Sequence, residues 1–132
     1  MTGTKRVGIA IVENGGRFLV GIRGPDVPLP GYAEFPGGKC LPDETALDCA
    51  VRECQEETGL AVAPQKLLDQ IEFEYPHGKV DLHFVLCRPV RLAEVCEQHE
   101  GFHWATVEQL KTMKFPDANA GVIRLLEASI MA

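Results

Sequence analysis

The stretch from Gly38 to Leu60, GKCLPDETALDCAVRECQEETGL, constrains this chain more than any other. Glu53 is followed by Glu56 and Glu57 at i+3 and i+4, so on a helix the three side chains emerge on one surface. Like charges at these spacings repel each other by about 0.2–0.5 kcal/mol per pair, so a purely structural helix gains nothing from them. A hard cation explains the cluster, because Mg2+ prefers oxygen ligands and is typically bound by one or two carboxylates plus substrate phosphates.

The same stretch predicts a helix that begins at Asp43 or Glu44, ends at Thr58 and is stopped by Gly59. Asp43 can cap the N-terminus, where an acidic side chain also suits the helix dipole. One apolar stripe with spacings i, i+3, i+4 and i+7 would face the core: Leu47, Ala50, Val51 and Cys54.

Composition indicates one globular domain over residues 1–132, because 45% of the residues are hydrophobic and 24% are charged. The net charge of −6 argues against a general nucleic-acid or membrane-surface partner, but a metal ion can neutralise the phosphates of a free nucleotide. No apolar run approaches the ~20 residues that cross a bilayer. Five cysteines without a CxxC pair favour reduced thiols over a zinc site, and we therefore expect a cytoplasmic protein.

Strand and helix patterns alternate along the rest of the chain, which predicts one mixed α/β (α+β) fold. Asn14-Gly15 can supply the positive φ angles of a hairpin turn, and a second turn is expected at Tyr75–Gly78. We expect loops at 24–32 and 91–101. The expected strands are Val7–Val12, Arg17–Ile22, Leu67–Glu74, Val80–Val90 and Phe102–Ala105. A helical turn is expected at Val107–Leu110 and a helix at Ala118–Ile130, with Val122, Leu125, Leu126 and Ser129 on or near its inner face.

An alternative interpretation of the acidic helix is a solvated surface, partly neutralised by an Arg52–Glu56 pair at i, i+4. The spacing of the whole stretch argues against it. The stretch resembles the Nudix box at every fixed position, with Cys54 in an aliphatic place: Gly38-x5-Glu44-x7-Arg52-Glu53-Cys54-x-Glu56-Glu57-x-Gly59-Leu60. The resemblance implies a mixed sheet sandwiched between α-helices. It also implies hydrolysis of a nucleoside diphosphate linked to another moiety, with Mg2+ as cofactor and Mn2+ as its substitute.

Roles for individual residues follow from the resemblance. Glu53, Glu56 and Glu57 would be metal ligands and catalytic residues, together with the backbone carbonyl of Gly38 as a ligand. Arg52 would orient a glutamate, Glu53 in the first place, and Glu44 would be structural or an outer-shell group. Glu100 resembles a further acidic ligand. The general base is left open between Glu53 and Glu100, as is the number of metal ions.

Outside the box, three segments resemble the MutT type, which hydrolyses oxidised guanine nucleotides: Glu34–Lys39, Phe73–Pro76 and Phe115–Asn119. This implies release of a nucleoside monophosphate and pyrophosphate from a nucleoside triphosphate such as 8-oxo-dGTP, a reaction that protects DNA from damaged precursors. The substrate-binding candidates are Arg23, Phe35, Lys39 and Asn119. Arg23 has an alternative role as a solvated cation, Phe35 as a core aromatic and Asn119 as a helix cap. Gly78 stands where this type tends to have an arginine.

Other functions remain open at this stage. Related enzymes cleave cytidine nucleotides, ADP-ribose or dinucleoside polyphosphates, and a Nudix domain can also serve as a nucleotide sensor without catalysis. The presence of all three box glutamates favours an enzyme over a sensor. We expect no stable nucleic-acid partner and no membrane association, and leave open whether the protein is a monomer or a homodimer.

Overall fold

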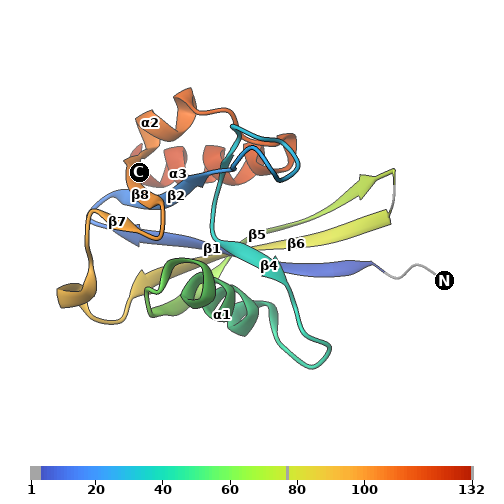
Figure 1. Cartoon of the computed structure of the whole chain (residues 1–132), viewed down its shortest axis with the longest axis horizontal. Coiled ribbons are helices and arrows are strands. Elements are labelled where there is room, and N and C mark those ends of the chain that lie inside the picture. The colour runs from blue at the N-terminus through green and yellow to red at the C-terminus, as the bar shows by residue number, and fades with distance from the viewer. Residues whose placement is uncertain (1–3, 77, 132) are drawn as a thin grey trace.

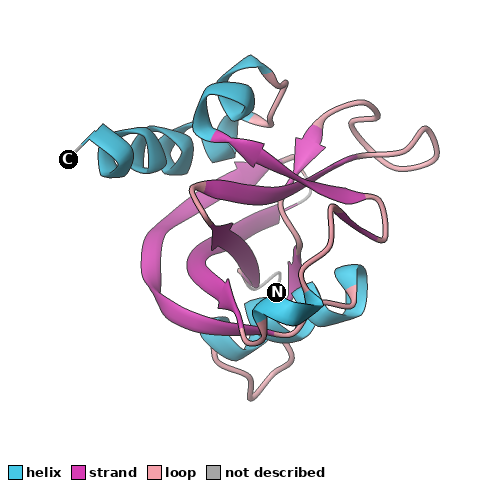
Figure 2. Ribbon diagram, turned by 90° about the vertical axis from the view of Figure 1, so that its left-hand side faces the viewer, coloured by secondary structure: helices cyan, strands magenta, loops and turns pink. Residues whose placement is uncertain are grey.

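The computed structural model describes residues 4–76 and 78–131, and within them a mixed sheet lies between helices (Figures 1 and 2). The strands are β1 (Lys5–Asn14), β2 (Arg17–Ile22), β3 (Ala33–Glu34), β4 (Gly37–Lys39), β5 (Val62–Tyr75), β6 (Gly78–Pro89), β7 (Gln98–His99) and β8 (Phe102–Thr106). The α-helices are α1 (Ala46–Thr58), α2 (Val107–Thr112) and α3 (Ala120–Met131), with 3-10 turns η1 (Leu92–Glu94) and η2 (Asp117–Asn119). The predicted fold class is confirmed.

Strand β1 is the centre of the sheet, whose order is β5-β6-β1-β2-β8-β7. One edge of β1 pairs in parallel with β6 from Lys5 to Val12. Its other edge changes partner: residues 7–9 pair with β4, and Glu13 and Asn14 pair with β2. Between these two pairings the Ala10 amide donates to the carbonyl of Pro36 at 2.8 Å. The edge of β1 therefore changes partner next to Gly37 and Gly38, the pair at the start of β4 that we call the glycine turn.

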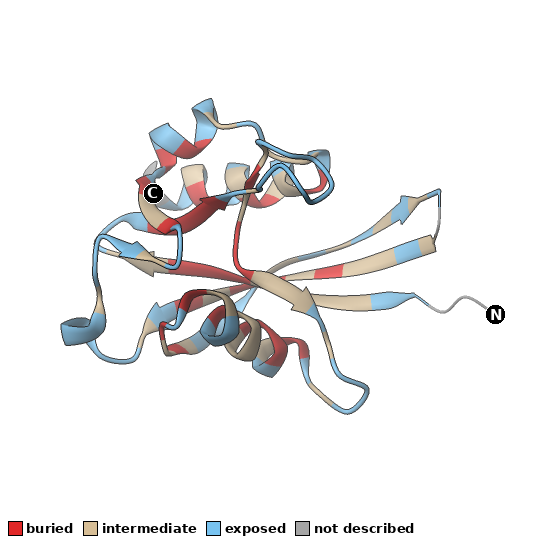
Figure 3. Ribbon diagram, viewed as in Figure 1, coloured by how far each residue is buried: buried red, intermediate tan, exposed pale blue. Residues whose placement is uncertain are grey.

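Two apolar cores cover the two faces of the sheet. The core beside α1 includes Ala10, Val12, Leu19, Ala50 and Cys54. The core beside α2 and α3 includes Ile11, Phe35, Phe84, Leu110 and Val122. Successive residues of β1 thus enter opposite cores, as the alternation of a strand requires. Figure 3 shows the buried residues running along the central strands and along the inner sides of the helices.

Helix α1 differs from the sequence prediction at its start. It begins at Ala46, and Thr45 rather than Asp43 caps it by accepting a hydrogen bond from the Asp48 amide at 3.1 Å. Glu44 precedes the helix because its amide and its carboxylate both close a turn onto Leu41. The predicted stop at Gly59 is confirmed, with φ at 77° in the left-handed region that favours glycine.

Several other boundaries also shift. Asn14 belongs to β1, and the positive φ angles of the hairpin come from Gly15 and Gly16, at 60° and 82°. Strand β5 starts at Val62, earlier than expected, because register shifts accommodate Pro64 within the pairing to β6. The expected loop at 91–101 contains η1 and β7, and helix α3 begins at Ala120, after η2. The expected turn at Tyr75–Gly78 includes residue 77, which lies outside the described residues.

Fewer residues of α3 face the core than the sequence predicted. Val122 and Leu126 are buried, whereas Leu125 is 44% exposed and Ser129 is also exposed. None of the helices in the described part of the chain has the length and apolar character needed to cross a membrane.

Gly8 of β1 allows α1 to pack directly on the sheet. A Cβ atom at this position would lie 2.7 Å from the Ala46 carbonyl oxygen and 2.8 Å from the Ala50 amide nitrogen. Both atoms belong to the helix backbone, so only a movement of α1 could relieve the clash.

We therefore predict that Gly8→Ala lowers the free energy of unfolding by about 1–3 kcal/mol, since it overpacks this contact. Gly24→Ala is the matched control, because a Cβ there would meet nothing within 4 Å and its φ is not in the left-handed region. Denaturant titration of both variants makes the comparison. Equal stability of the two variants would show that α1 does not depend on this contact.

Candidate active site

Arg52 is the centre of an ion-pair network on α1. Its guanidinium binds Glu44 in a bidentate manner, through Nε at 2.7 Å and Nη2 at 2.9 Å. Its Nη1 also donates to Glu53 Oε1 at 3.0 Å and to both oxygens of Glu56, at 3.1 and 3.2 Å. Nη2 reaches the carbonyl of Lys39 at 3.2 Å. One cation thus joins three carboxylates of the helix region to strand β4.

Glu44 is fixed from several sides. Besides the fork of Arg52, its carboxylate accepts a hydrogen bond from the Leu41 amide, and its carbonyl accepts one from the Arg6 guanidinium. The hydrogen bonds from Arg52 and from the Leu41 amide lower the pKa of Glu44 to about 2. Glu44 is therefore ionised at all ordinary pH values and serves as the permanent counter-charge of Arg52.

The glycine turn meets the acidic helix at two points. The Glu53 carboxylate lies directly against Gly38, since a Cβ there would be only 2.4 Å from its carbon and from Oε2. The Gly37 amide donates to Glu57 Oε2 at 2.8 Å. Cys49 donates its thiol to the Gly38 carbonyl at 3.3 Å, a weak hydrogen bond. The absence of side chains at Gly37 and Gly38 is what brings backbone and carboxylates together.

Glu57 is the half-buried carboxylate of the cluster. Its pKa is raised from 4.5 to about 7, chiefly by burial and also by the nearby charges of Glu53, Glu34 and Glu56, while the Gly37 hydrogen bond opposes the shift. A half-buried carboxyl surrounded by three others favours the arrival of a positive charge.

The donor set suits a hard divalent cation. Glu53 Oε2 and Glu57 Oε1 accept none of the hydrogen bonds found among the described residues, and the Gly38 carbonyl, which lies in the pairing of Gly38 with Gly8, accepts a weak hydrogen bond from the Cys49 thiol. These are oxygen atoms, the ligands that Mg2+ and Mn2+ prefer. In the described parts of the chain, no three carboxylate, thiol or imidazole groups converge as a ready-made cage, and Arg52 holds Glu56 by both oxygens. Substrate phosphates would therefore have to supply part of any coordination.

A cavity of about 170 Å3 opens beside the glycine turn. It joins three of the predicted substrate-binding residues, Arg23, Phe35 and Asn119, to the turn itself through Gly37 and Gly38. The remaining walls come from β1, β3 and the segment before α3: Val7, Ile9, Ala33, Glu34 and Pro116. The cavity and the acidic cluster of α1 thus share the two glycines.

The cavity residues also have partners within the protein. Arg23 Nη1 pairs with Glu34 Oε1 at 2.9 Å, and its Nε donates to the Pro28 carbonyl at 2.5 Å. Phe35 is buried and stacks on Phe115, with ring centroids 5.0 Å apart. The Asn119 amide makes a 3.4 Å hydrogen bond to the Pro116 carbonyl, so it supports the turn into α3. Each of the three residues thus has a structural contact within the protein, and its role in substrate binding stays a prediction.

Two predicted site residues lie apart from the cavity. Lys39 is exposed at the end of β4, where its carbonyl binds Arg52 and its side chain does not line the cavity. Glu100 occupies the exposed turn between β7 and β8 with a positive φ of 51°. No hydrogen bond or ion pair among the described residues joins it to the glutamates of α1. Its assignment as a metal ligand or base rests on the sequence resemblance alone.

Sequence reasoning missed three residues of the site. Glu34 binds Arg23 and adds negative charge near Glu57, Cys49 donates to Gly38, and Arg6 donates to the Glu44 carbonyl. Each reaches its partner through the fold, and Arg6 is 38 positions from Glu44. Of the three, only Glu34 could have been found from the sequence, because it lies in the segment that leads to Gly37 and Gly38.

Several known proteins are similar to this chain in sequence or in fold. The sequence pattern of the NUDIX domain matches residues 3–126. An 8-oxo-dGTP diphosphatase of Escherichia coli (strain K12) is 32% identical over 121 residues, which cover 92% of this chain and 93% of that protein. A CTP pyrophosphohydrolase of the same strain is 29% identical over 119 residues, covering 90% and 86%. The crystal structure of a MutT protein from Methanosarcina mazei Go1 has the same fold, with a TM-score of 0.78, 24% identity and coverage of 99% and 98%.

The raised pKa of Glu57 predicts how stability depends on pH. Because its folded-state pKa is above the unfolded value, the metal-free protein loses stability as the pH rises from 4.5 towards 7 and Glu57 ionises. Glutamine cannot ionise but still accepts the Gly37 hydrogen bond. We predict that Glu57→Gln is more stable than the wild type at high pH by about 1 kcal/mol, a value reduced for partial exposure, and differs little below the unfolded pKa.

Denaturant unfolding with a chelator present, repeated across this pH range, measures the difference. A constant difference between the two proteins at all pH values would show that Glu57 does not titrate in this range.

Proposed function

The chain belongs to the Nudix family of hydrolases, and from that premise we propose that it hydrolyses a nucleoside triphosphate to a nucleoside monophosphate and pyrophosphate. The leading substrate is an oxidised purine deoxynucleotide such as 8-oxo-dGTP, with Mg2+ as the cofactor and Mn2+ as its substitute. One observation supports this most: the acidic cluster and a recess of about 170 Å3 share Gly37 and Gly38. A phosphate chain could therefore reach the carboxylates while the base of the nucleotide enters the recess.

Glu53, Glu57 and the Gly38 carbonyl would hold the metal, and Glu56 would join them if Arg52 releases one of its oxygens. When bound, the divalent ion supplies neutralisation of phosphate charge and acidification of the attacking water. The protein's own part is positional. Arg52 fixes the orientation of Glu53 through Oε1 and leaves Oε2 directed to the glycine turn, and it is itself fixed by Glu44.

Proton removal from the water requires a carboxylate near the reacting phosphate. The Glu53 carboxylate already lies against Gly38, and this position supports Glu53 as the base. Glu100 lies in the β7–β8 turn and would have to move towards the glutamates of α1 to take that role.

Base selection would lie in the recess on the other side of the turn. The Asn119 amide carries both a donor and an acceptor, which suits a purine whose oxidation adds an N–H and an oxygen. Phe35, which stacks on Phe115, gives the recess an aromatic side. The 32% identity to an 8-oxo-dGTP diphosphatase supports this choice, and the 29% identity to a CTP pyrophosphohydrolase makes CTP the necessary competitor in any assay. Since the proposed substrate is a free intracellular nucleotide, we expect the enzyme in the cytoplasm.

A panel assay with Mg2+ tests the proposal: 8-oxo-dGTP, dGTP, CTP, ADP-ribose and a dinucleoside polyphosphate are incubated in parallel, and pyrophosphate and monophosphate are measured. Preferred turnover of the oxidised purine is the expected result. Preference for CTP or ADP-ribose would change the substrate and keep the hydrolase. Tight binding with no product from any nucleotide would identify a sensor.

For the acidic cluster we predict that Glu53→Gln lowers kcat by about 100-fold or more with the fold retained, because it removes a metal ligand or base. Glu108→Gln is the control, since that carboxylate is exposed on α2 away from the cavity. Circular dichroism and thermal unfolding verify the fold of both variants. Near-normal turnover by folded Glu53→Gln would refute the assignment of Glu53.

For the recess we predict that Asn119→Ala reduces the preference for the oxidised purine over CTP and leaves the dependence on Mg2+ concentration unchanged. The reason is that the amide contacts the base and not the phosphates. Gln65→Ala, which removes an exposed amide from β5, serves as the control. An unchanged ranking of the substrate panel in Asn119→Ala would exclude a base-reading role.

A further inference from the structure

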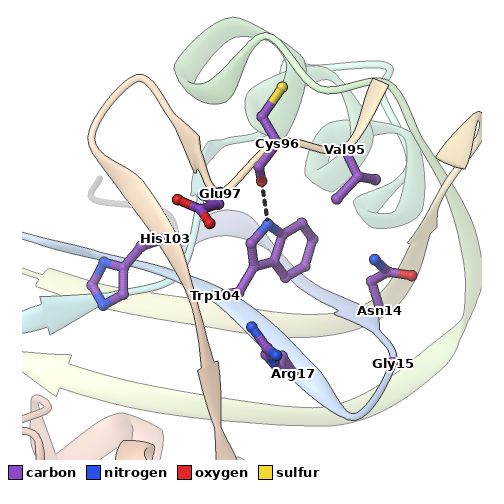
Figure 4. A pocket seen from close by; sticks show the side chains of 8 residues that line it. All are labelled: Asn14, Gly15, Arg17, Val95, Cys96, Glu97, His103 and Trp104. Carbon is purple, nitrogen blue, oxygen red and sulfur yellow. Dashed lines mark hydrogen bonds between the residues drawn. The ribbon is translucent and has the colours of Figure 1, made fainter. Parts of the chain in front are cut away.

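A second and larger cavity lies outside the hydrolytic site. Its volume is about 520 Å3, within the range of small-molecule sites, and it shares no residue with the recess at the glycine turn. It lies where the β1–β2 hairpin turn meets β8 and the segment that follows η1. Figure 4 shows Trp104 at its centre, with Asn14 and Arg17 from the hairpin and Val95, Cys96 and Glu97 from the segment around it.

The indole of Trp104 is held in one orientation. Its Nε1–H donates to the Cys96 carbonyl at 2.7 Å, and the Cys96 amide donates to His99 Nε2 at 3.0 Å. The His99 ring meets the indole edge-on, with centroids 6.2 Å apart at 88°. The N–H of the indole is already hydrogen-bonded, and the ring is only partly buried. The indole can therefore offer a ligand its aromatic surface. A preorganised tryptophan is a suitable platform on which a nucleobase can stack.

Polar groups of both charges surround the indole and have no partners in the described part of the chain. Arg17 forms no ion pair or side-chain hydrogen bond there, and the same holds for Glu97 and for the amide of Asn14. In Figure 4, Glu97 and Arg17 lie on different sides of the indole. In a protein of net charge −6, an arginine without a carboxylate partner beside a cavity is suited to an anion.

These groups together define a ligand. A carboxylate has only acceptor oxygens, so Glu97 matches an edge with two neighbouring N–H donors. Guanine offers such an edge through N1–H and its 2-amino group, whereas adenine offers an acceptor at N1. The planar fork of Arg17 matches a phosphate. We propose that this cavity binds a guanine mononucleotide, with the base stacked on Trp104, its N1/2-amino edge at Glu97 and its phosphate at Arg17.

This binding is separate from the hydrolytic reaction and does not rest on the function proposed above. The segment that carries Glu97 leads into β7 and the turn at Glu100, so the ligand would lie next to the strand pair that presents that acid. The site is therefore placed to sense the nucleotide pool while catalysis proceeds at the glycine turn.

Trp104 is the single tryptophan of the chain, so its emission reports on this cavity directly. We would titrate the metal-free protein with GMP, IMP and AMP, and follow the emission after correcting for absorption by the base. Calorimetry provides a second measure of affinity. The expected result is a saturable change with GMP, with IMP binding more weakly because it lacks the 2-amino group, and AMP weakest because it lacks the N1–H donor as well.

Two variants assign the contacts. Glu97→Gln should lower the affinity for GMP by about tenfold or more, the usual effect of losing a hydrogen bond to a charged group, and should change the affinity for AMP little. Arg17→Gln should lower the affinity for all three nucleotides and leave the affinity for guanosine unchanged. The controls are Glu108→Gln and Arg124→Gln, exposed residues of α2 and α3 that should bind as the wild type does.

Three results would overturn the proposal: no change of Trp104 emission with GMP, equal affinity for GMP and AMP, or unchanged GMP affinity in both Glu97→Gln and Arg17→Gln. Because none of these residues lines the hydrolytic recess, the panel assay for hydrolysis keeps its own outcome whichever result is found.

Discussion

The contact between Arg52 and Glu44 is the interaction on which the site depends. A helix that carries Glu53, Glu56 and Glu57 on neighbouring positions is unfavourable on its own, since the charges repel one another. Arg52 offsets this repulsion because it touches two of the three, and Glu44 holds Arg52 through a bidentate pair. Glu44 can do so only because it lies before the helix, where its carboxylate also closes the turn onto Leu41. The point at which α1 starts therefore determines whether Glu44 can hold Arg52 in place.

The split edge of β1 explains why the acidic cluster and the recess beside Gly37 and Gly38 lie together. Strand β1 pairs with β4 over residues 7–9 and with β2 from Glu13 onward, so the segment from β3 to β4 runs along this edge and brings Gly37 and Gly38 against α1. On the opposite side of this segment, Phe35 belongs to the core beside α2 and α3. One short segment therefore contacts the carboxylates with its glycines and borders the recess with its aromatic side chain.

Local patterns predicted the elements well where one signal dominates. The strand Arg17–Ile22 and the stop at Gly59 agree with the structure, because β-branched content and a left-handed glycine leave little choice. The helix start was predicted two or three residues early, since Asp43 and Thr45 are both suited to cap a helix and the sequence does not show that Glu44 is turned away to bind Arg52. The exposure of Leu125 and the contacts of Glu34, Cys49 and Arg6 depend on how distant elements meet. The spacing of the Nudix box predicted the type of reaction, whereas no motif in the sequence predicted the second cavity around Trp104.

The parallel pairing of β1 with β6 has a consequence for how the protein is made. The paired residues, Lys5 with Val80 and Val12 with Cys87, are separated by more than half of the chain. Such non-local pairing forms slowly, because loop closure must precede the contacts that reward it. On a ribosome, β1 and α1 emerge long before β6 can join them. Until then the acidic helix has no completed sheet to pack on, so the emerging chain exposes a strand that is buried in the folded protein, together with the carboxylates of α1.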